Sequence, residues 1–428
     1  MQSFTRGDKM NVVRQEAIGG LNGIRARGAT LRPRPEPQND GTTQYIRATE
    51  PIICSHAVGT PDTSSIQMKT RRAVTLATIC LSAALSLTSC GDTSEVASTT
   101  TEAPSSELSL EKIATLDQPV DAASRENEDA IYFVGRLGKI HRYSDNTMES
   151  SPVLDISDLT DGEGERGLLG LAFSPDGLTA YINYTNLKDD TTIASVSVDS
   201  DGAFLRESLN TILVIKQPFQ NHNAGDIVVE PSGMLLVPMG DGGSSNDPLR
   251  VSLDDSSPLG KVLRVNPRDG SYTILARGLR NPWRVDLYDN RLWLADVGQN
   301  SFEEVSVLND VQQSSSAQIV DFGWSAFEAN ERVNTDQTVV AHIAPVISYP
   351  HGDDGCSISG GAVAVTGSLI NRYVFGDYCS GKVWSIPVDE TSPKATLHFD
   401  DIDSPAAIVR ANKDLFVLSL NGDIWQIR

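Results

Sequence analysis

The sequence predicts an all-β fold, a six-bladed β-propeller of four-stranded antiparallel blades. From about residue 110 onward, an apolar strand that runs through a turn into a second apolar strand recurs six times, while helical periodicity is almost absent. The 34 Gly and 21 Pro suit a chain with many turns. Six repeats over residues 110–428 leave about 53 residues for each blade, a reasonable size for four short strands and their turns.

The six repeats follow one another along the chain. In each, a first apolar strand leads into a second that ends in or near Gly or Asp. The pairs are Pro119–Val120 with Ile131–Val134, Gly170–Gly177 with Tyr181–Tyr184, Asp226–Gly233 with Leu235–Pro238, Trp283–Leu287 with Leu292–Leu294, Gly361–Val365 with Tyr373–Phe375, and Ala407–Val409 with Leu415–Leu418. A β-sandwich is the alternative architecture, but it would need fewer strands than this pattern contains.

The chain before the repeats has a different composition. Residues 1–67 are polar, rich in Arg, Gly, Thr and Pro, and show no sustained apolar period, so we interpret them as a disordered or misassigned extension. Residues 68–90 have the layout of a secretory signal, with a basic start and an apolar run too short to span a bilayer comfortably. Signals begin a chain, so we expect translation to start at Met68.

The end of this signal resembles a bacterial lipobox in which Cys90 becomes the lipidated first residue. A signal anchor with an incidental Cys is the alternative. Residues 91–109 form a Ser/Thr-rich tether of the kind that holds a domain away from a membrane. We therefore expect the protein to be secreted and to be anchored by its lipid to the outer side of the cell membrane, away from the cytoplasm.

Charge and cysteine content exclude some classes of protein. The chain has 35 Lys and Arg against 56 Asp and Glu, a formal net charge of -21, which disfavours binding to nucleic acid by charge. Of the five cysteines, Cys356 and Cys379 are the two that fall within the predicted propeller. In an exported protein two such cysteines predict a disulfide, whereas a metal site would need companions at ligand spacing.

Propellers bind ligands where the loops between strands converge, so polar loops are candidate sites. His222 stands in the loop 221–226, and Asp241 follows it by about one hairpin, so both can return to the same end of the propeller. A carboxylate beside a histidine fixes its tautomer and raises its basicity, as a general base requires. Spacing alone favours the alternative, a loop histidine that only hydrogen-bonds a turn.

Two further loops carry candidate groups. Arg280, in the loop 278–283, offers a guanidinium that can bind a carboxylate or a developing oxyanion, or alternatively form a salt bridge that locks two blades. The segment 295–305 combines acidic residues with a Gly-containing turn whose carbonyls suit Ca²⁺, although its spacing is not that of an EF-hand.

Together these segments resemble the glucose/sorbosone dehydrogenase family, which contains soluble quinoprotein aldose sugar dehydrogenases and relatives such as the hedgehog-interacting-protein-like proteins. The resemblance covers about residues 113–428. It is carried by the motifs Gly164–Asp176, Asn221–Asp226, Gly240–Gly243, Gly260–Val265, Gly278–Trp283, Asp296–Asn300, Glu303–Val305, Asp321–Trp324, Gly355–Gly361 and Phe375–Gly381. It implies a six-bladed propeller, in agreement with the strand repeats.

The resemblance also implies a mechanism. In the quinoprotein members, pyrroloquinoline quinone (PQQ) lies over the channel mouth with a Ca²⁺ ion that polarises it. His222 matches the residue that removes the proton of the anomeric hydroxyl while hydride passes to the quinone, and Asp241 matches the acid that orients this base. Arg280 matches the residue that binds the quinone oxygen, with Asn281 beside it.

Two further positions are matched. Gly298 and Gln299 correspond to the turn whose backbone carbonyls hold the Ca²⁺. Glu165 stands where the sugar-oxidising members carry a Gln near cofactor and substrate. The resemblance therefore implies a small-molecule sugar as substrate and an electron acceptor that is neither NAD nor oxygen, and the sequence does not identify that acceptor.

The sequence departs from the family at the groups that bind the three PQQ carboxylates. Well-studied members place a Lys in the loop matched by residues 377–381 and an Arg pair in the loop matched by residues 401–405. Here Cys379 occupies the Lys position and the Arg pair is missing. Each lost charge-assisted hydrogen bond is worth about 1.5–3 kcal/mol, so we expect weaker PQQ binding than in those members.

The matched and the missing family residues leave three candidate functions. The first is a dehydrogenase that oxidises an aldose at C1 to the lactone with PQQ and Ca²⁺, favoured because a base and its partner have no obvious structural purpose. The second is a cofactor-free propeller that binds a glycan or a protein at the cell surface. A Ca²⁺-dependent lactonase is the third, although the sequence has no dense acidic cluster for it.

Overall fold

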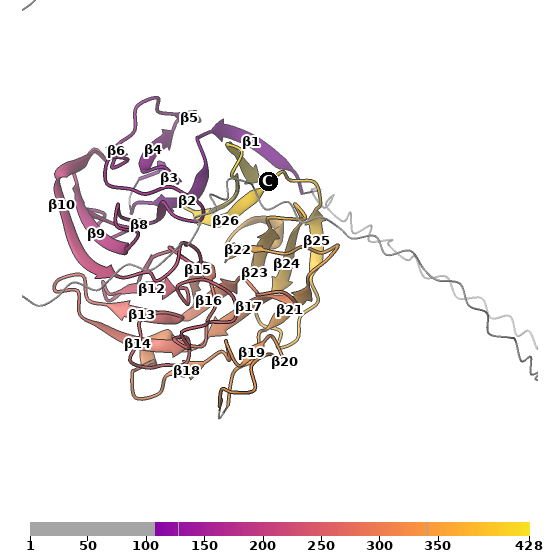
Figure 1. Ribbon diagram of the computed structural model, residues 1–428. Helices are drawn as coiled ribbons and strands as arrows, with labels where there is room; N and C mark the ends of the chain where they lie inside the picture. The colour runs from indigo at the N-terminus through magenta and orange to yellow at the C-terminus, as the bar shows by residue number, and fades with distance from the viewer. Residues whose placement is uncertain (1–107, 127, 340) are drawn as a thin grey trace, which may run out of the picture. The chain divides into compact units, whose positions relative to one another are not determined.

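The structure is a computed structural model that describes residues 108–126, 128–339 and 341–428. The predicted extension 1–67, the signal 68–90 with the lipidation site Cys90, and nearly all of the tether 91–109 lie outside the described residues. Those segments therefore stay predictions. The described chain is a six-bladed β-propeller, as predicted, whose blades follow one another around a central channel (Figure 1).

In the first three blades, antiparallel strands that follow one another in the chain pair side by side, and blade 3 gains one parallel strand from later in the chain. Blade 1 contains β2 (Pro119–Ser124), β3 (Ile131–Gly135), β4 (Lys139–Ser144), β5 (Thr147–Met148) and β6 (Leu154–Asp155). Blade 2 contains β7 (Leu168–Phe173), β8 (Thr179–Thr185), β9 (Thr191–Val198) and β10 (Phe204–Ile215). Blade 3 contains β11 (Val228–Val229), β12 (Leu235–Met239), β13 (Lys261–Val265), β14 (Tyr272–Arg277) and the parallel β18 (Val320–Asp321).

The other three blades repeat the pattern. Blade 4 contains β15 (Pro282–Tyr288), β16 (Arg291–Asp296), β17 (Phe302–Leu308) and β21 (Ile347–Pro350). Blade 5 contains β22 (Ile358–Val363), β23 (Arg372–Asp377), β24 (Val383–Pro387) and β25 (Thr396–Phe399). Blade 6 contains β26 (Pro405–Ala411), β27 (Asp414–Ser419), β28 (Asp423–Ile427) and β1 (Leu110–Thr115). All six predicted strand pairs are the first two strands of a blade.

Short elements complete the described chain. They are the hairpin β19 (Phe327–Glu328) with β20 (Glu331–Arg332) and the 3-10 helices η1 (Val311–Gln313) and η2 (Gly367–Leu369). Within the described residues, no helix is long and apolar enough to cross a membrane.

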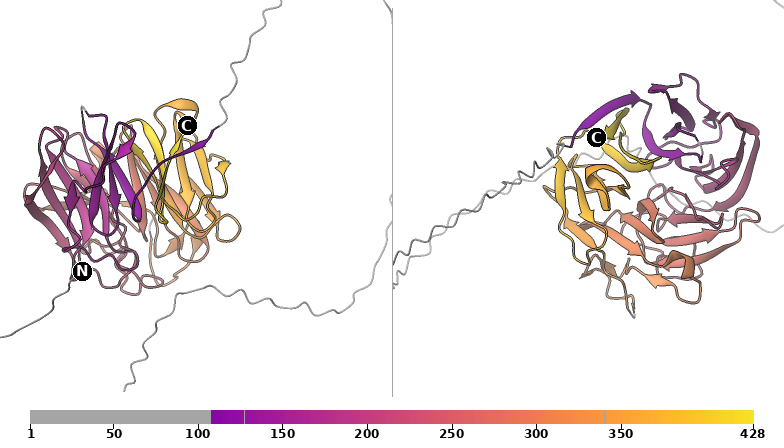
Figure 2. Two further views of the ribbon diagram at one scale, coloured as in Figure 1. Left: turned by 90° about the horizontal axis from the view of Figure 1, so that it is seen from above. Right: turned by 180° about the vertical axis from the view of Figure 1, so that it is seen from behind.

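The ring is closed by the first strand of the described chain. Strand β1 pairs with β28, so that Glu111 lies opposite Gln426 and the N-terminal strand forms the outer edge of the last blade (Figures 1 and 2). Blade 6 therefore contains strands from both ends of the propeller domain. If β1 unfolds, the last blade loses its outer strand.

Apolar side chains fill the space between blades. Six buried clusters are found among the described residues, and each joins two neighbouring blades. In the cluster between blades 1 and 2, Tyr132 packs its ring 5.0 Å from that of Phe173. The alternating apolar residues of each strand thus face the adjacent blade, and their burial holds the ring together.

Buried aspartates add polar ties around the central channel, which the first strands of all six blades line. Asp121 of blade 1 accepts the amide of Leu171 in blade 2 at 2.8 Å. Asp226 accepts the amide of Val285 at 2.8 Å, and Asp286 accepts that of Val363 at 2.8 Å. Burial raises the pKa of each of these three carboxyls, and that of Asp121 to about 7.

These raised values predict how stability depends on pH. Because folding favours the protonated form, the contribution of Asp121 is present below its ordinary pKa of 3.8 and is lost as the pH rises toward about 7. We expect the free energy of unfolding, measured with urea, to be lower at pH 8 than at pH 5, by about 1.4 kcal/mol for each pH unit between 5 and about 7. Asp121→Asn should flatten this dependence; a stability that rises over the interval would contradict it.

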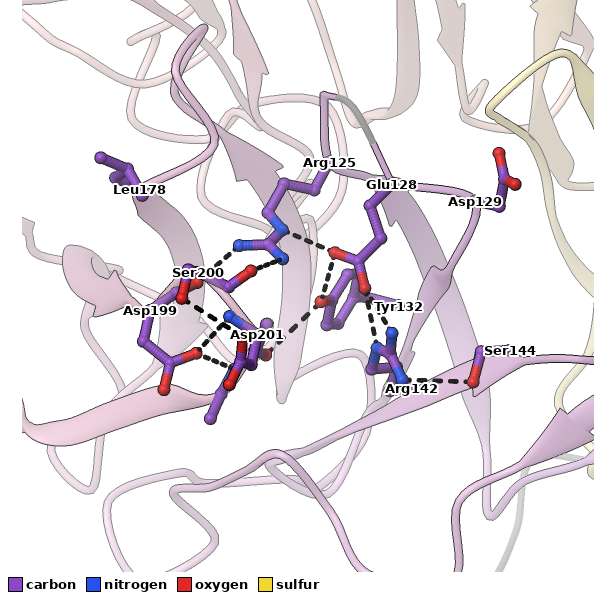
Figure 3. A network of polar contacts seen from close by, with 12 residues as sticks. Arg125, Glu128, Asp129, Tyr132, Arg142, Ser144, Leu178, Asp199, Ser200 and Asp201 are labelled. Carbon is purple, nitrogen blue, oxygen red and sulfur yellow. Dashed lines mark hydrogen bonds and ion pairs between the residues drawn. The ribbon is translucent and has the colours of Figure 1, made fainter.

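A charged network joins blades 1 and 2 at the C-terminal end of β2 (Figure 3). Arg125 donates to Glu128 at 2.6 Å and to the carbonyls of Asp199 at 2.6 Å and Ser200 at 3.1 Å. Arg142 from β4 donates to the other oxygen of Glu128 at 2.6 Å. The connection between β9 and β10 is thereby fastened to blade 1, which fixes the angle between the two blades.

Candidate functional site

The candidate site is a cavity of about 450 Å³ at the end of the channel where the first strands of the blades begin. Loops between successive blades supply Glu165, His222, Arg280 and Asn281 to its wall. Hairpins within blades and the segment before β22 supply others, among them Arg136, Gly298, Gln299, Cys356 and Tyr378. The cavity is therefore lined by six predicted site residues and one predicted cysteine from distant parts of the chain: Glu165, His222, Arg280, Asn281, Gly298, Gln299 and Cys356. Asp241 and Cys379 do not line it, but they contact His222 and Cys356, which do.

His222 and Asp241 form a buried pair. His222 Nδ1 lies 2.6 Å from Asp241 Oδ1, and both side chains are almost inaccessible to solvent. An ionised carboxylate can only accept, so Nδ1 carries the shared proton and Nε2 is left as the atom with a free lone pair. Asp241 also accepts the amide of Gly243 at 2.9 Å and the indole Nε1–H of Trp324 at 2.8 Å.

The loop that carries His222 has a strained backbone. His222 (φ 58°) and Ala224 (φ 50°) both adopt the left-handed conformation that side chains disfavour. Hydrogen bonds hold both residues, because the amide of His222 donates to Glu165 at 2.7 Å and that of Ala224 to Asn281 at 2.9 Å. Asn281 also donates to Glu165 at 3.3 Å. Glu165 and Asn281 thus hold the imidazole in place as well as lining the cavity.

Arg280 is held on three sides. It donates through Nη1 to the carbonyl of Val297 at 2.8 Å and through Nε to Gln299 at 3.3 Å, and its backbone carbonyl accepts the amide of Asp241 at 2.8 Å. Among the described residues, none accepts a hydrogen bond from Nη2. Within the part of the chain that the structure describes, no carboxylate forms an ion pair with the guanidinium, which disfavours the alternative of a blade-locking salt bridge and leaves Nη2 available to an oxygen in the cavity.

The buried carboxylate of Asp296 holds the backbone of the loop that contains Arg280. This carboxylate accepts the amide of Arg280 at 3.0 Å and that of Asn281 at 2.6 Å. Burial raises the pKa of Asp296 from 3.8 to about 7, although both amides and the charge of Arg280 lower it. The two residues that line the cavity side by side are therefore oriented by one buried acid.

Two carboxylates shape the turn that contains Gly298 and Gln299: Glu303 accepts the amide of Gly298 at 3.2 Å, and Glu328 accepts the amides that follow. Glu328 Oε1 accepts four consecutive amides, those of residues 299 to 302, at 2.8, 2.9, 2.9 and 3.2 Å. The carbonyls of Gly298 and Gln299 accept no hydrogen bond from any described residue. With the amides of the turn bound to Glu303 and Glu328, these two carbonyls remain as oxygen donors of the kind that Ca²⁺ prefers.

Other oxygen donors for a cation are few. No group of three or more His, Cys, Asp and Glu side chains suited to a metal ion occurs within residues 108–126, 128–339 and 341–428. A cation at this turn would therefore take most of its coordination from backbone carbonyls, water and a bound ligand.

Cys356 and Cys379 form a disulfide with a Cα–Cα distance of 5.7 Å. Buried Asp377 organises both cysteine segments, since it accepts the amides of Cys356 at 3.1 Å, Ser357 at 2.9 Å, Cys379 at 2.9 Å and Ser380 at 2.9 Å. Cys379 is thus linked to Cys356, which lines the cavity.

Sequence reasoning missed several residues of the site. Arg136 lines the cavity and donates to the carbonyls of Gly162 at 2.8 Å and Arg166 at 2.8 Å. Trp324, Asp296 and Glu328 hold the residues that line the cavity. Arg136 comes just after the second strand of its blade, as Asp241 does. Inspection of the residues that follow the second strand in every repeat could therefore have found it.

Comparisons with known proteins concern the family and the fold. The sequence model of the family described as Glucose / Sorbosone dehydrogenase matches residues 116–373. The HIPL1 protein of Arabidopsis thaliana is 26% identical over 264 residues, which are 50% of this chain and 36% of that protein. The HIPL2 protein of the same plant is 22% identical over 382 residues, 65% of this chain and 53% of that protein. The chain thus spans about a third to a half of these relatives.

Solved structures show the same fold. The PQQ-bound aldose sugar dehydrogenase of Streptomyces coelicolor has a TM-score of 0.62 and 21% identity, and the match covers 76% of this chain and 99% of that one. The apo-form soluble aldose sugar dehydrogenase of Escherichia coli has a TM-score of 0.61 and 16% identity, with coverage of 75% and 99%. These likenesses establish the six-bladed architecture.

Proposed function

This chain belongs to the glucose/sorbosone dehydrogenase family, and on that premise we propose that it oxidises an aldose sugar at C1 to the lactone with PQQ and Ca²⁺. The observation that carries the proposal is the buried pair of His222 and Asp241 at the wall of a cavity that also contains Arg280. A base, its orienting acid and a cation in one cavity supply what removal of a hydroxyl proton requires.

His222 acts as the general base. Its Nδ1–H bond to Asp241 leaves Nε2 to accept the proton of the anomeric hydroxyl, and the negative charge of Asp241 stabilises the imidazolium that forms. Glu165 and Asn281 keep the imidazole in place through the backbone on either side of it. The proton then leaves from Nε2 to water at the cavity mouth.

The residues present fit a quinone and a Ca²⁺ ion. The cavity volume of about 450 Å³ accommodates a tricyclic quinone beside a sugar, and Nη2 of Arg280 is available to a quinone oxygen. The carbonyls of Gly298 and Gln299 would hold the Ca²⁺. When bound, PQQ would accept the hydride of C1, so two electrons leave the sugar and one proton goes to His222.

The charges around the cavity bear on cofactor affinity. Two guanidiniums, Arg136 and Arg280, line it against one carboxylate, Glu165. Arg136 therefore offsets part of the charge lost where Cys379 replaces a Lys, although its hydrogen bonds to backbone carbonyls leave it little freedom to bind a ligand directly. We expect PQQ to bind more weakly than to proteins with the complete set of cations.

A cofactor-free function is the second candidate, favoured by the disulfide that occupies the Lys position. In this case the cavity would bind a glycan or a protein at the cell surface. The lipid anchor at Cys90 belongs to both proposals, since it would hold the propeller at the outer side of the cell membrane in either case.

One assay separates the two candidates. The full-length protein is incubated with Ca²⁺ and PQQ, and reduction of an artificial electron acceptor is followed with a panel of aldoses. Acceptor reduction that requires both additions and an aldose supports the dehydrogenase. No reduction with any aldose, together with glycan binding in the absence of PQQ, would replace it by the cofactor-free function.

A further inference from the structure

The pair of His222 and Asp241 has a third member, Trp324, which lies outside the cavity wall. The indole Nε1–H of Trp324 donates to Asp241 Oδ2 at 2.8 Å, and both side chains are buried. The opposite oxygen, Oδ1, is the one that faces His222 Nδ1 at 2.6 Å. Within the described chain, His222 and Trp324 are the two side chains that donate to this carboxylate, one to each oxygen.

Trp324 also contacts the Arg280 loop. Its ring centroid lies 5.8 Å from the guanidinium carbon of Arg280, within the range of a cation–π interaction. Its backbone amide donates to the carbonyl of Gly278 at 3.0 Å, which fixes the indole relative to the start of this loop. One side chain therefore touches both the acid behind the base and the cation of the site.

We propose that Trp324 is a positioning residue that sets the basicity of His222 by withdrawing charge from the carboxylate of Asp241. The proposal rests on the proposed function, which gives His222 the role of base. A donor on Oδ2 stabilises the carboxylate and lessens the negative charge that Oδ1 presents to the imidazole. The same bond prevents the carboxylate from rotating, so Oδ1 stays aligned with Nδ1.

Removal of the donor has a defined consequence. In Trp324→Phe the carboxylate keeps the amide of Gly243 and the imidazole, and the charge on Oδ1 increases. The imidazolium form of His222 becomes more stable, so its titration midpoint moves to higher pH. Among the described residues, the charged groups that share the cavity with His222 are Arg136, Glu165 and Arg280, with Asp296 behind Arg280. The phenylalanine ring keeps an aromatic face toward Arg280, so the substitution leaves these charges in place.

The experiment is an NMR titration of the full-length protein labelled at histidine and tryptophan. The chain has 6 His and 5 Trp, few enough for each signal to be assigned by substitution. We expect Trp324→Phe to raise the His222 midpoint by about half a unit to one unit, part of the energy of a charge-assisted hydrogen bond. A midpoint that stays unchanged or falls would overturn the proposal.

Trp293→Phe is the matched control. Trp293 is also buried, but it stacks on Tyr373 and its Nε1 has no hydrogen-bond partner among the described residues. It therefore tests the loss of a buried indole without the loss of a donor to Asp241. In the Trp293→Phe protein, His222 should titrate at the same midpoint as in the unmodified protein. If Trp293→Phe and Trp324→Phe shift this midpoint equally, the proposal is overturned.

A second measurement needs no substitution that could disturb folding. In the unmodified protein, the indole N–H signal of Trp324 should shift with pH at the same midpoint as His222, because Asp241 joins the two groups. Separate midpoints would overturn the proposal. Neither titration requires PQQ or a sugar, so failure of the dehydrogenase assay and failure of this proposal are independent results.

Discussion

Replacement of His222 with alanine is expected to lower kcat for aldose oxidation by about 10² to 10⁴, the usual contribution of a general base. Nε2 of His222 is the candidate acceptor for the substrate proton, and no other histidine lines the cavity among the described residues. The propeller should stay folded, because Asp241 keeps the amide of Gly243 and the indole of Trp324. Acceptor reduction measures kcat, and near-UV circular dichroism measures folding.

His398→Ala is the control for this variant. His398 lies on the outer strand β25 and shares a hydrogen bond of 2.7 Å with Ser385, remote from the cavity wall. It should retain the activity of the unmodified protein. If His222→Ala retains activity as well, His222 is not the base.

Replacement of Glu328 with alanine is expected to lower the free energy of unfolding by about 3 kcal/mol or more and to abolish stabilisation by Ca²⁺. Four amides would lose their shared acceptor, and each donor left without a partner costs about 1–3 kcal/mol when it is not solvated. Without Glu328 the turn no longer presents the carbonyls of Gly298 and Gln299 in a fixed arrangement. Thermal unfolding with and without Ca²⁺ measures both effects.

Glu328→Gln separates charge from geometry. It keeps an oxygen where Oε1 lies and loses only the negative charge, so we expect a smaller loss of stability and a retained, weaker response to Ca²⁺. A Glu328→Ala protein that Ca²⁺ stabilises as strongly as the unmodified chain would show that the ion binds elsewhere.

The propeller was predictable because its signals are local. Each pair of strands, such as β7 with β8, is joined by a short turn, so apolar alternation and a Gly or Pro mark it within about fifteen residues. The pairing of β1 with β28 was not predicted, because strands at opposite ends of the domain have no shared local pattern. The same holds for β18, which joins blade 3 from a later part of the chain.

The site was predictable only in part, for a similar reason. His222 and Asp241 are one hairpin apart, so their spacing alone places them at one end of the propeller. Trp324 reaches Asp241 from 83 residues away, and Glu328 reaches its turn from the hairpin β19–β20. Both contacts come from the long segment between β17 and β21, which folds back on blades 3 and 4, and spacing along the chain does not encode where such a segment returns.

The central claim is that this cavity binds PQQ together with Ca²⁺ and holds it against His222. Calorimetric titration of PQQ into the full-length protein, with Ca²⁺ and then with a chelator, tests it most directly. The account predicts binding at one site with a dissociation constant in the micromolar range or below, weakened by the chelator and by Arg280→Leu. Absence of PQQ binding at micromolar concentrations with Ca²⁺ present would contradict it.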